Sequence, residues 1–293
     1  MAEYIKRKQE VTEQGNKLDV PGIVSRVLTD IKENGEAAVR KYSKQFDNYD
    51  PESFRVTEDE IMKATKSLPQ TVIEDTKFCQ DQVRKFAEAQ LASLSEVEVE
   101  TQPGITLGHK LIPIKNVGAY VPGGRYPIVA SAHMSVIPPK VAGVERVIVT
   151  TPPQKGEGIH PAVLHALHAA GADEIYKIGG IQAIGAMAYG TENMNPVDVI
   201  VGPNAFVAEA KRQIFGPVGI DQIAGPSEIL VLADETADPE LVAADLLGQA
   251  EHDVNAVPIL VSTSRELIDK VLVEMEKQLP LLSTKDVAKA AWE

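Results

Sequence analysis

Hydrophobic and polar residues alternate along this chain with two different periods. Between residues 21 and 46 the apolar positions recur every three or four residues, which predicts helical structure, and Gly35 divides the region into two helices. Thr57 followed by Glu60 has the spacing of a capping box and predicts a short helix. Pro69 stands where a long helix is predicted to begin. The N-terminal region is therefore predicted to be helical.

The period then changes to two. Residues 96–100 and 105–114 alternate apolar and polar positions on either side of Pro103 and Gly104. Alternation at this period is typical of strands, and a glycine-containing turn between two such runs predicts a hairpin.

From residue 117 onward, short apolar strands alternate with helical segments. The predicted strands are residues 147–150, 174–178, 198–202, 229–233 and 259–261, and the predicted helices are residues 130–142, 161–170, 181–189, 205–215 and 265–278, with a further helix after Asp238 and Pro239. Strands and helices in repeated alternation predict parallel sheets with crossover helices.

The domain boundaries are predicted from these changes of period, because the chain has no internal repeat or proline-rich linker. They fall near Lys115 and Asp221. We expect an α/β fold of two Rossmann-like units, one inserted in the other, with a helical N-terminal region. Residues 1–116 and 222–293 would form a discontinuous first domain, and residues 117–221 the inserted Rossmann-like domain.

The composition of the chain argues against several classes of partner and site. The 293 residues carry a formal charge of -13, which disfavours nucleic acid and anionic membrane surfaces. Cys79 is the single cysteine, so an intrachain disulfide and a cysteine-based zinc cluster are both excluded. Neither a secretory leader nor a membrane-spanning segment is recognisable. We therefore expect a cytoplasmic protein.

Two patterns carry candidate chemistry. Asp245, Gln249 and His252 fall on one stripe at the end of a predicted helix, where an amide oxygen and an imidazole could ligate zinc. A solvated helix end is the alternative. The pairs Gly123–Gly124 and Gly179–Gly180 lie where an α/β sheet binds ligands, at the carboxyl ends of strands, although ordinary turns would also need glycine there.

Several long segments in the same order resemble the histidinol dehydrogenase family. They are residues 117–124, 179–184, 206–212 and 224–232. The resemblance implies an enzyme that uses NAD and zinc to oxidise a primary alcohol through an aldehyde to a carboxylate. It also implies a homodimer.

The resemblance assigns NAD contacts to Tyr120, Gln182 and Asn204. One departure affects the last of these, because the family usually has an additional glycine between Pro203 and Asn204. A missing residue at a tight turn would redirect the side chains that follow.

Ser227, Gln249 and His252 match family residues that contact substrate, and the last two also match zinc ligands. The family's remaining zinc ligands and its catalytic glutamate and histidine match no residue of this chain and would follow Glu293. A truncated dehydrogenase is therefore expected. The alternative is a non-catalytic fragment that binds nucleotide or partner chains, and a reading frame that continues past Glu293 would decide between them.

The segment after Gly124 is similar to the sulfopropanediol dehydrogenase branch of the family. Arg125 supplies a permanent cation, and Ser131 and His133 could donate hydrogen bonds to a sulfonate. These residues predict a small anionic alcohol as substrate, such as 2,3-dihydroxypropane-1-sulfonate. The alternatives are L-histidinol as substrate, for histidine biosynthesis, and an Arg125 that only pairs with a surface carboxylate.

Overall fold

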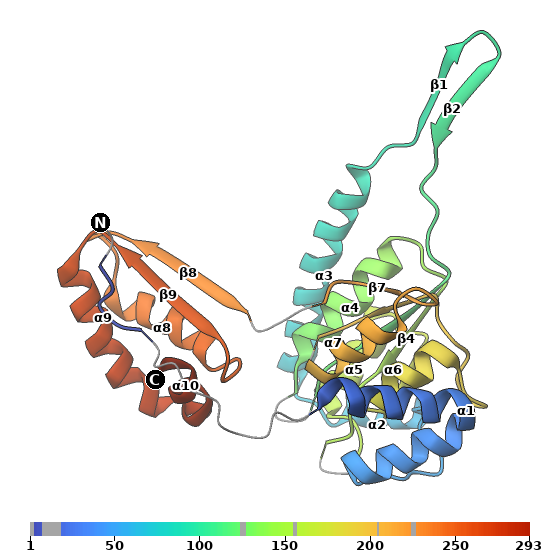
Figure 1. The fold of residues 1–293 in the computed structure, drawn as a ribbon, viewed down its shortest axis with the longest axis horizontal. Helices are drawn as coiled ribbons and strands as arrows, with labels where there is room; N and C mark the ends of the chain where they lie inside the picture. The colour runs from blue at the N-terminus through green and yellow to red at the C-terminus, as the bar shows by residue number, and fades with distance from the viewer. Residues whose placement is uncertain (1–2, 8–18, 124–126, 155–156, 204, 224–226) are drawn as a thin grey trace. The chain divides into compact units, whose positions relative to one another are not determined.

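The computed structural model describes residues 3–7, 19–123, 127–154, 157–203, 205–223 and 227–293. The chain divides into two compact units (Figure 1). The larger unit is Leu18–Ala224, and the smaller one combines Met1–Lys17 with Gly225–Glu293.

A five-stranded parallel sheet forms the centre of the larger unit. Its strands lie in the order β5-β4-β3-β6-β7. They are β3 (Asn116–Tyr120), β4 (Arg146–Thr150), β5 (Glu174–Tyr176), β6 (Val199–Val201) and β7 (Gly219–Ile220). Counted from β3 the order is 3-2-1-4-5, which is the order of a doubly wound nucleotide-binding sheet. The parallel sheet predicted from the alternating pattern is confirmed, and the short β7 was not foreseen.

Helices cover both faces of this sheet, in keeping with the rule that parallel sheets are buried on both sides. α4 (Val129–Val141) and α5 (Pro161–Ala170) share one hydrophobic core with Val117 and Ala119. α6 (Gly180–Tyr189) and α7 (Ala205–Ile214) share the other core with Tyr120. Successive residues of β3 therefore alternate between the two cores.

Three N-terminal helices add an outer layer to the same unit. α1 (Val20–Asp47) packs on α6 and α7, while α2 (Glu58–Lys66) packs on α5 and α3 (Gln70–Ala92) on α4. Their apolar sides join the two cores of the sheet. The prediction of a helical N-terminal region is confirmed.

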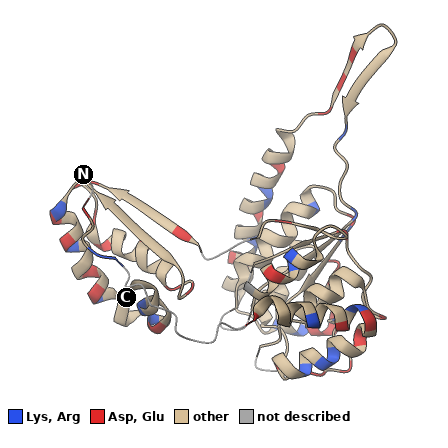
Figure 2. Ribbon diagram, in the orientation of Figure 1, with Lys and Arg blue, Asp and Glu red and all other residues tan. Residues whose placement is uncertain are grey.

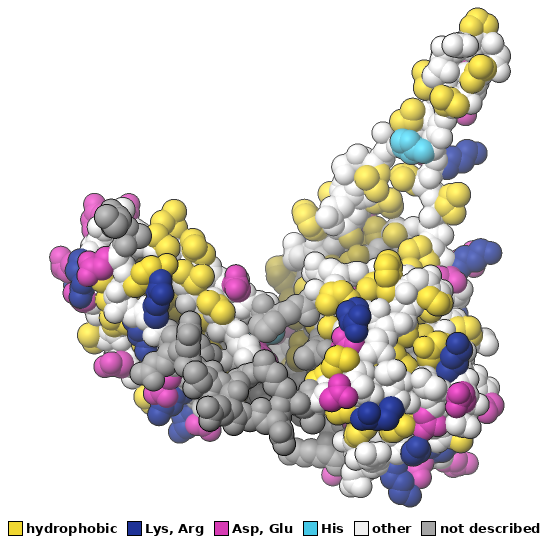
Figure 3. All heavy atoms as spheres, in the orientation of Figure 1, with side chains coloured by type: hydrophobic (Ala, Val, Ile, Leu, Met, Phe, Trp, Pro, Cys, Tyr) yellow, Lys and Arg dark blue, Asp and Glu magenta, His cyan; other side chains and the backbone are white. Residues whose placement is uncertain are grey.

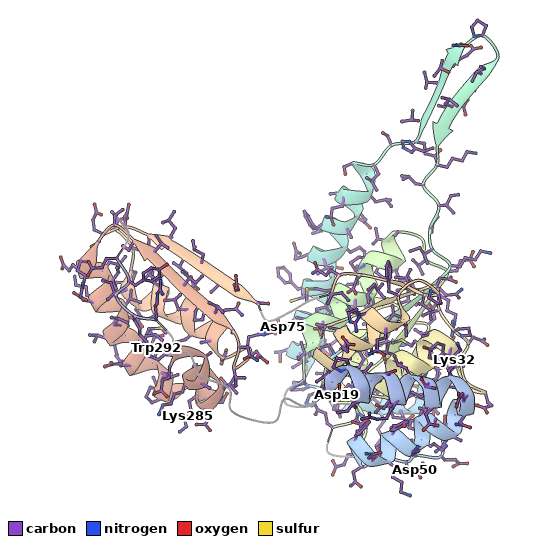
Figure 4. The ribbon with its side chains drawn as sticks, in the orientation of Figure 1. Asp19, Lys32, Asp50, Asp75, Lys285 and Trp292 are labelled. Carbon is purple, nitrogen blue, oxygen red and sulfur yellow. The ribbon has the colours of Figure 1, made fainter. Side chains whose placement is uncertain are left out.

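Local signals in the sequence set the ends of these helices. Asp19, labelled in Figure 4, accepts a hydrogen bond from the Gly22 N–H at 3.0 Å and caps α1. Gly35 leaves the helical conformation at φ 49° and kinks α1, as predicted. Thr57 and Glu60 form the predicted capping box, with both reciprocal hydrogen bonds present.

A hairpin projects from the larger unit (Figure 1). β1 (Val97–Gln102) pairs antiparallel with β2 (Ile105–His109), so the predicted hairpin is confirmed with a shorter second strand. Both strands are exposed along their whole length. Hydrophobic side chains therefore gather on the projection, as Figure 3 shows.

The smaller unit contains a two-stranded parallel sheet. β8 (Glu228–Ala233) and β9 (Val257–Ser262) pair along their full length, with α8 (Pro239–Ala250) as the crossover. α9 (Arg265–Gln278), the 3-10 helix η1 (Leu279–Leu281) and α10 (Lys285–Trp292) follow. Asp238 caps α8 through the Glu240 N–H at 2.9 Å, as its place before Pro239 predicts. Trp292, labelled in Figure 4, packs on the core of this unit.

One face of the β8–β9 sheet packs on α8 and α9, and the other carries exposed hydrophobic side chains. The exposed set is Leu230, Leu232, Val257, Ile259 and Val261. Because β8 and β9 pair only with each other in the described sheet, they do not extend the five-stranded sheet.

The division into units differs in two respects from the predicted domains. The second boundary, expected between residues 221 and 222, lies at Gly225. Helices α1 to α3 pack on the five-stranded sheet, whereas residues 1–116 were expected to join residues 222–293. An inserted Rossmann-like unit stays a prediction for the whole protein.

Charged side chains of both signs are interspersed on the helices. Figure 2 shows this distribution. On α9, for example, Arg265 pairs with Asp269 and Lys270 with Glu266. None of the helices in the described ranges combines the length and apolar character needed to cross a membrane.

A buried lysine ties the ends of β6 and β7 together. Lys211 on α7 is fully buried, and its ammonium group donates to the Gly202 carbonyl at 2.7 Å, the Gln222 carbonyl at 3.0 Å and the Asp221 carboxylate. The Asp221 carboxylate also accepts from the Gly202 N–H at 3.0 Å. The two members of this ion pair therefore bind both backbone groups of Gly202, the first residue after β6.

Replacing this lysine should destabilise the larger unit. Lys211→Met leaves the Asp221 carboxylate without its cation. We expect the free energy of unfolding to fall by about 3 kcal/mol. This is the lower end of the range for a buried pair, because the Asp221 side chain is 34% exposed. Denaturant unfolding measures the loss.

Arg212→Met is the matched control, because the neighbouring Arg212 pairs with Glu209 on the surface and should change stability little. Adding Asp221→Asn to Lys211→Met should recover part of the loss. If Lys211→Met and Arg212→Met lowered the free energy of unfolding equally, the buried pair would contribute no more to stability than the surface pair.

Candidate functional site

The carboxyl ends of β3 and β6 lie side by side at the centre of the five-stranded sheet. Here the strand order reverses, since β4 follows β3 on one side and β6 lies on the other. In open α/β sheets the crevice at this switch point is the usual place for a ligand. Tyr120 ends β3, and Gly202 follows the last residue of β6.

Gly202 and Tyr120 approach each other too closely for any other residue at position 202. A β-carbon there would lie 2.5 Å from the Tyr120 carbonyl oxygen and 2.7 Å from its β-carbon. The φ of Gly202 is +143°, which also favours glycine. The two strand ends are thus packed backbone against backbone at the candidate site.

Tyr120 reaches from β3 to the first turn of α6. Its phenol oxygen accepts a hydrogen bond from the Gly180 N–H at 3.2 Å and keeps its own O–H to donate. Burial raises the pKa of Tyr120 to about 12, so the phenol stays protonated at neutral pH. Tyr120 can therefore serve as a hydrogen-bond donor.

Gln182 lies on the same turn of α6 and is fully buried. Its Nε2 donates to the Asp47 carboxylate at 2.8 Å, across 135 residues of sequence. Its Oε1 is buried without a hydrogen-bond partner. Burial raises the pKa of Asp47, and hydrogen bonds from Gln182 and from the Gly179 N–H oppose that rise.

The structure thus brings two of the three predicted NAD residues together. Tyr120 and Gln182 meet at the turn where α6 begins, next to the switch point of the sheet. Asn204, the third, and Arg125 lie outside the described residues. The N-cap residue of α6 makes no side-chain cap, and the N–H groups at the start of the helix donate instead to Asp47 and Tyr120.

The predicted substrate and zinc residues lie in the smaller unit, at the amino ends of its strands. Ser227 immediately precedes β8, and the Gln249 side-chain amide donates to the Ser227 carbonyl at 3.2 Å. α8 ends at Ala250, so His252 lies in the following turn, where its N–H donates to the Gln249 carbonyl at 3.1 Å. Ser227 and His252 are exposed.

This group of residues supplies part of a zinc shell. The Gln249 Oε1 remains able to coordinate because the hydrogen bond to Ser227 uses the nitrogen of the amide. Zinc sites need at least three protein ligands, and usually four when closed. Within the described ranges no cluster of three or more His, Cys, Asp or Glu side chains could hold a metal. Gln249 and His252 by themselves do not complete the shell.

His133, predicted to contact the substrate, lies in the interior between helices. Its Nδ1 faces Gln80 Nε2 at 3.2 Å, and Gln80 also donates to the Ala166 carbonyl at 2.8 Å. Burial lowers the pKa of His133, which favours the neutral imidazole. Ser131 is buried as well. The structure gives both residues packing roles, and their contact with substrate stays a prediction.

Two residues at the edge of the sheet were not predicted from the sequence. Asp47 is the last residue of α1, and Lys211 lies inside the segment 206–212 that carried the family resemblance. A lysine on the apolar side of a predicted helix is a signal that could have identified Lys211. No local pattern identifies Asp47, because its partner is distant in sequence.

Comparison with known proteins is consistent with the geometry. A sequence model of the histidinol dehydrogenase family matches residues 9–293. The chain is 55% identical over 295 residues to a histidinol dehydrogenase homolog of Shouchella clausii, and the match covers 100% of this chain and 69% of that protein. It is 43% identical over 293 residues to the sulfopropanediol 3-dehydrogenase of Ruegeria pomeroyi, covering 99% and 67%.

The crystal structure of histidinol dehydrogenase from Elizabethkingia anophelis superimposes on this fold with a TM-score of 0.89 at 38% identity. The superposition covers 95% of this chain and 64% of that one. This chain therefore spans about two thirds of the length of these relatives. Since the family model, the close relatives and the fold agree over nearly all of its residues, this chain belongs to the histidinol dehydrogenase family of oxidoreductases.

Proposed function

We propose that the larger unit binds NAD at the carboxyl edge of its sheet, as part of an enzyme that oxidises a primary alcohol through an aldehyde to a carboxylate. The observation that carries this proposal is the meeting of Tyr120 and Gln182 at the first turn of α6, beside a doubly wound switch point. Both side chains are buried, so nucleotide binding would have to uncover them.

The chemistry of each residue fits this role. The protonated Tyr120 phenol can donate a hydrogen bond, and the Gln182 Oε1 can accept one. NAD would supply the hydride acceptor when bound. The residues at the carboxyl ends of β3 and β6 would orient the cofactor and exclude water from it.

We further propose that Ser227, Gln249 and His252 contact the substrate, and that Gln249 and His252 contribute to a zinc shell. Two neutral ligands hold zinc weakly, so the remaining ligands must come from other residues. Zinc would orient the alcohol once its shell is complete. The protein would act as a homodimer, and the single exposed Cys79 is compatible with a cytoplasmic location.

Two substrates remain candidates. Arg125 favours a small anionic alcohol such as 2,3-dihydroxypropane-1-sulfonate, and a relative that is 43% identical is named sulfopropanediol 3-dehydrogenase. L-Histidinol is supported about equally, since the superimposed crystal structure is a histidinol dehydrogenase. Because His133 packs against Gln80, the proposal of an anionic substrate depends mainly on Arg125.

NADH should bind to this chain, and Tyr120→Phe should weaken the binding. Loss of one hydrogen bond of about 1 kcal/mol corresponds to a roughly fivefold higher Kd. A titration followed by the fluorescence of the reduced nicotinamide measures the change. Tyr42→Phe is the matched control, because the Tyr42 phenol donates to Asp30 within α1 at 2.8 Å. Undetectable NADH binding by the unmodified chain would contradict the proposal.

Zinc should bind to this chain far more weakly than the ~10–16 kcal/mol typical of closed structural shells, and dehydrogenase turnover should be negligible. His252→Ala should weaken the remaining zinc binding, whereas His168→Ala, at another exposed histidine, should not. Isothermal titration with zinc tests both variants. Tight binding of one zinc per chain that survives His252→Ala would show that other residues form the site.

Steady-state kinetics on the protein in the longest form that its gene encodes would identify the substrate. If the anionic alcohol is right, kcat/KM should favour the sulfonate over histidinol, and Arg125→Ala should lower kcat/KM for the sulfonate roughly tenfold or more, as expected for a lost charged contact. A preference for histidinol, with both kcat/KM values unchanged by Arg125→Ala, would assign the enzyme to histidine biosynthesis.

A further inference from the structure

The pair formed by Asp47 and Gln182 has a role beyond packing. We propose that Asp47 is a positioning residue whose carboxylate fixes the orientation of the Gln182 amide, so that Gln182 Oε1 faces a bound dinucleotide and accepts a hydrogen bond from it. The inference rests on the proposed NAD site and concerns a residue outside the segments that carried the family resemblance.

The orientation of the amide follows from charge. A carboxylate can only accept hydrogen bonds, so the group of Gln182 that faces it has to be the Nε2 donor, as observed at 2.8 Å. The opposite orientation would place the amide oxygen against the carboxylate oxygens. The charge of Asp47 therefore decides which end of the amide points away from α1.

The end that points away is a buried acceptor without a donor. Among the described residues, Gln182 Oε1 and Ser43 Oγ are the buried side-chain atoms that lack a hydrogen bond. Since a buried polar group without a partner is unfavourable, such an atom is expected where a ligand completes it. Gln182 is fully buried and emerges from the first turn of α6.

Gly180 lies directly beside this oxygen. Gly180 has φ +57°, and a β-carbon on it would lie 3.0 Å from Gln182 Oε1. A larger residue at position 180 would therefore crowd the acceptor, which a ligand reaches only when the buried Gln182 side chain is uncovered. The Gly180 N–H binds the Tyr120 phenol, which places that O–H on the same turn of α6.

The chemistry of the partner is limited by the same charge. An oxygen acceptor next to the Asp47 carboxylate disfavours a phosphate and favours an uncharged donor. A dinucleotide has three kinds of such donor: the ribose hydroxyl groups, the amino group of the adenine and the carboxamide of the nicotinamide. The pyrophosphate would bind elsewhere on this edge.

The test is the affinity of Asp47→Asn for NADH. An asparagine can face Gln182 with either end of its amide, so the orientation of Gln182 is no longer fixed, and the Kd should rise about tenfold. The melting temperature should stay the same or rise, because a half-buried carboxylate is removed. Asp30→Asn is the matched control on the same helix, since Asp30 accepts from Asn34 at 2.8 Å, in a network that does not involve Gln182.

Exchanging the two groups provides the decisive variant. Gln182→Glu alone opposes two carboxylates and should weaken NADH binding more than Asp47→Asn does. The double variant Asp47→Asn/Gln182→Glu restores a donor facing a carboxylate and keeps an acceptor oxygen toward the ligand. It should bind NADH within about threefold of the unmodified chain. If Asp47 only stabilised the fold, the double variant would recover the melting temperature lost in Gln182→Glu but would not recover the affinity for NADH.

The outcomes separate this inference from the proposed function. If the unmodified chain fails to bind NADH, the NAD site is wrong. If it binds and Asp47→Asn binds equally well, the positioning role is overturned while the NAD site stands. ADP-ribose as a second probe narrows the donor: an equal loss for both ligands supports a ribose hydroxyl or the adenine amino group, and a loss for NADH alone supports the carboxamide.

Discussion

The close approach of Gly202 to Tyr120 is the constraint on which the carboxyl edge of the sheet depends. Two backbone segments meet there with no side chain between them. The contact allows β3 and β6 to end at the same level, with the buried ammonium group of Lys211 beneath the turn. Because Tyr120 also binds the first turn of α6, a shift at Gly202 would be transmitted to Gln182 and Asp47.

The polar groups at this edge are buried to an unusual degree for a surface where a ligand is expected. Lys211 and Gln182 are fully buried. Gln182 is held by Asp47, 135 positions away, and Lys211 by residues 9 to 11 positions away. Such networks have a desolvation cost, which their hydrogen bonds have to offset. What they provide is a fixed geometry, and a nucleotide site benefits from donors and acceptors that are already oriented.

The two units contribute different chemistry. The larger one has the strand order and helix N-terminus of a nucleotide-binding sheet, while the smaller one carries Ser227, Gln249 and His252 at the amino ends of its strands. The smaller sheet is covered on one face by α8 and α9 and exposes apolar side chains on the other. Parallel sheets are ordinarily covered on both faces, which makes this unit the less self-sufficient of the two.

The sequence by itself determined the local structure. The break at Gly35, the capping box of Thr57 and Glu60, and the cap of Asp238 each depend on residues a few positions apart, and all three were predicted. The family resemblance added Tyr120 and Gln182. Only the tertiary structure decided that α1 packs on α6, that Asp47 faces Gln182 and that His133 turns toward Gln80. These contacts join residues more than 50 positions apart, and since their pairing depends on how whole helices pack, no local pattern of residues encodes them.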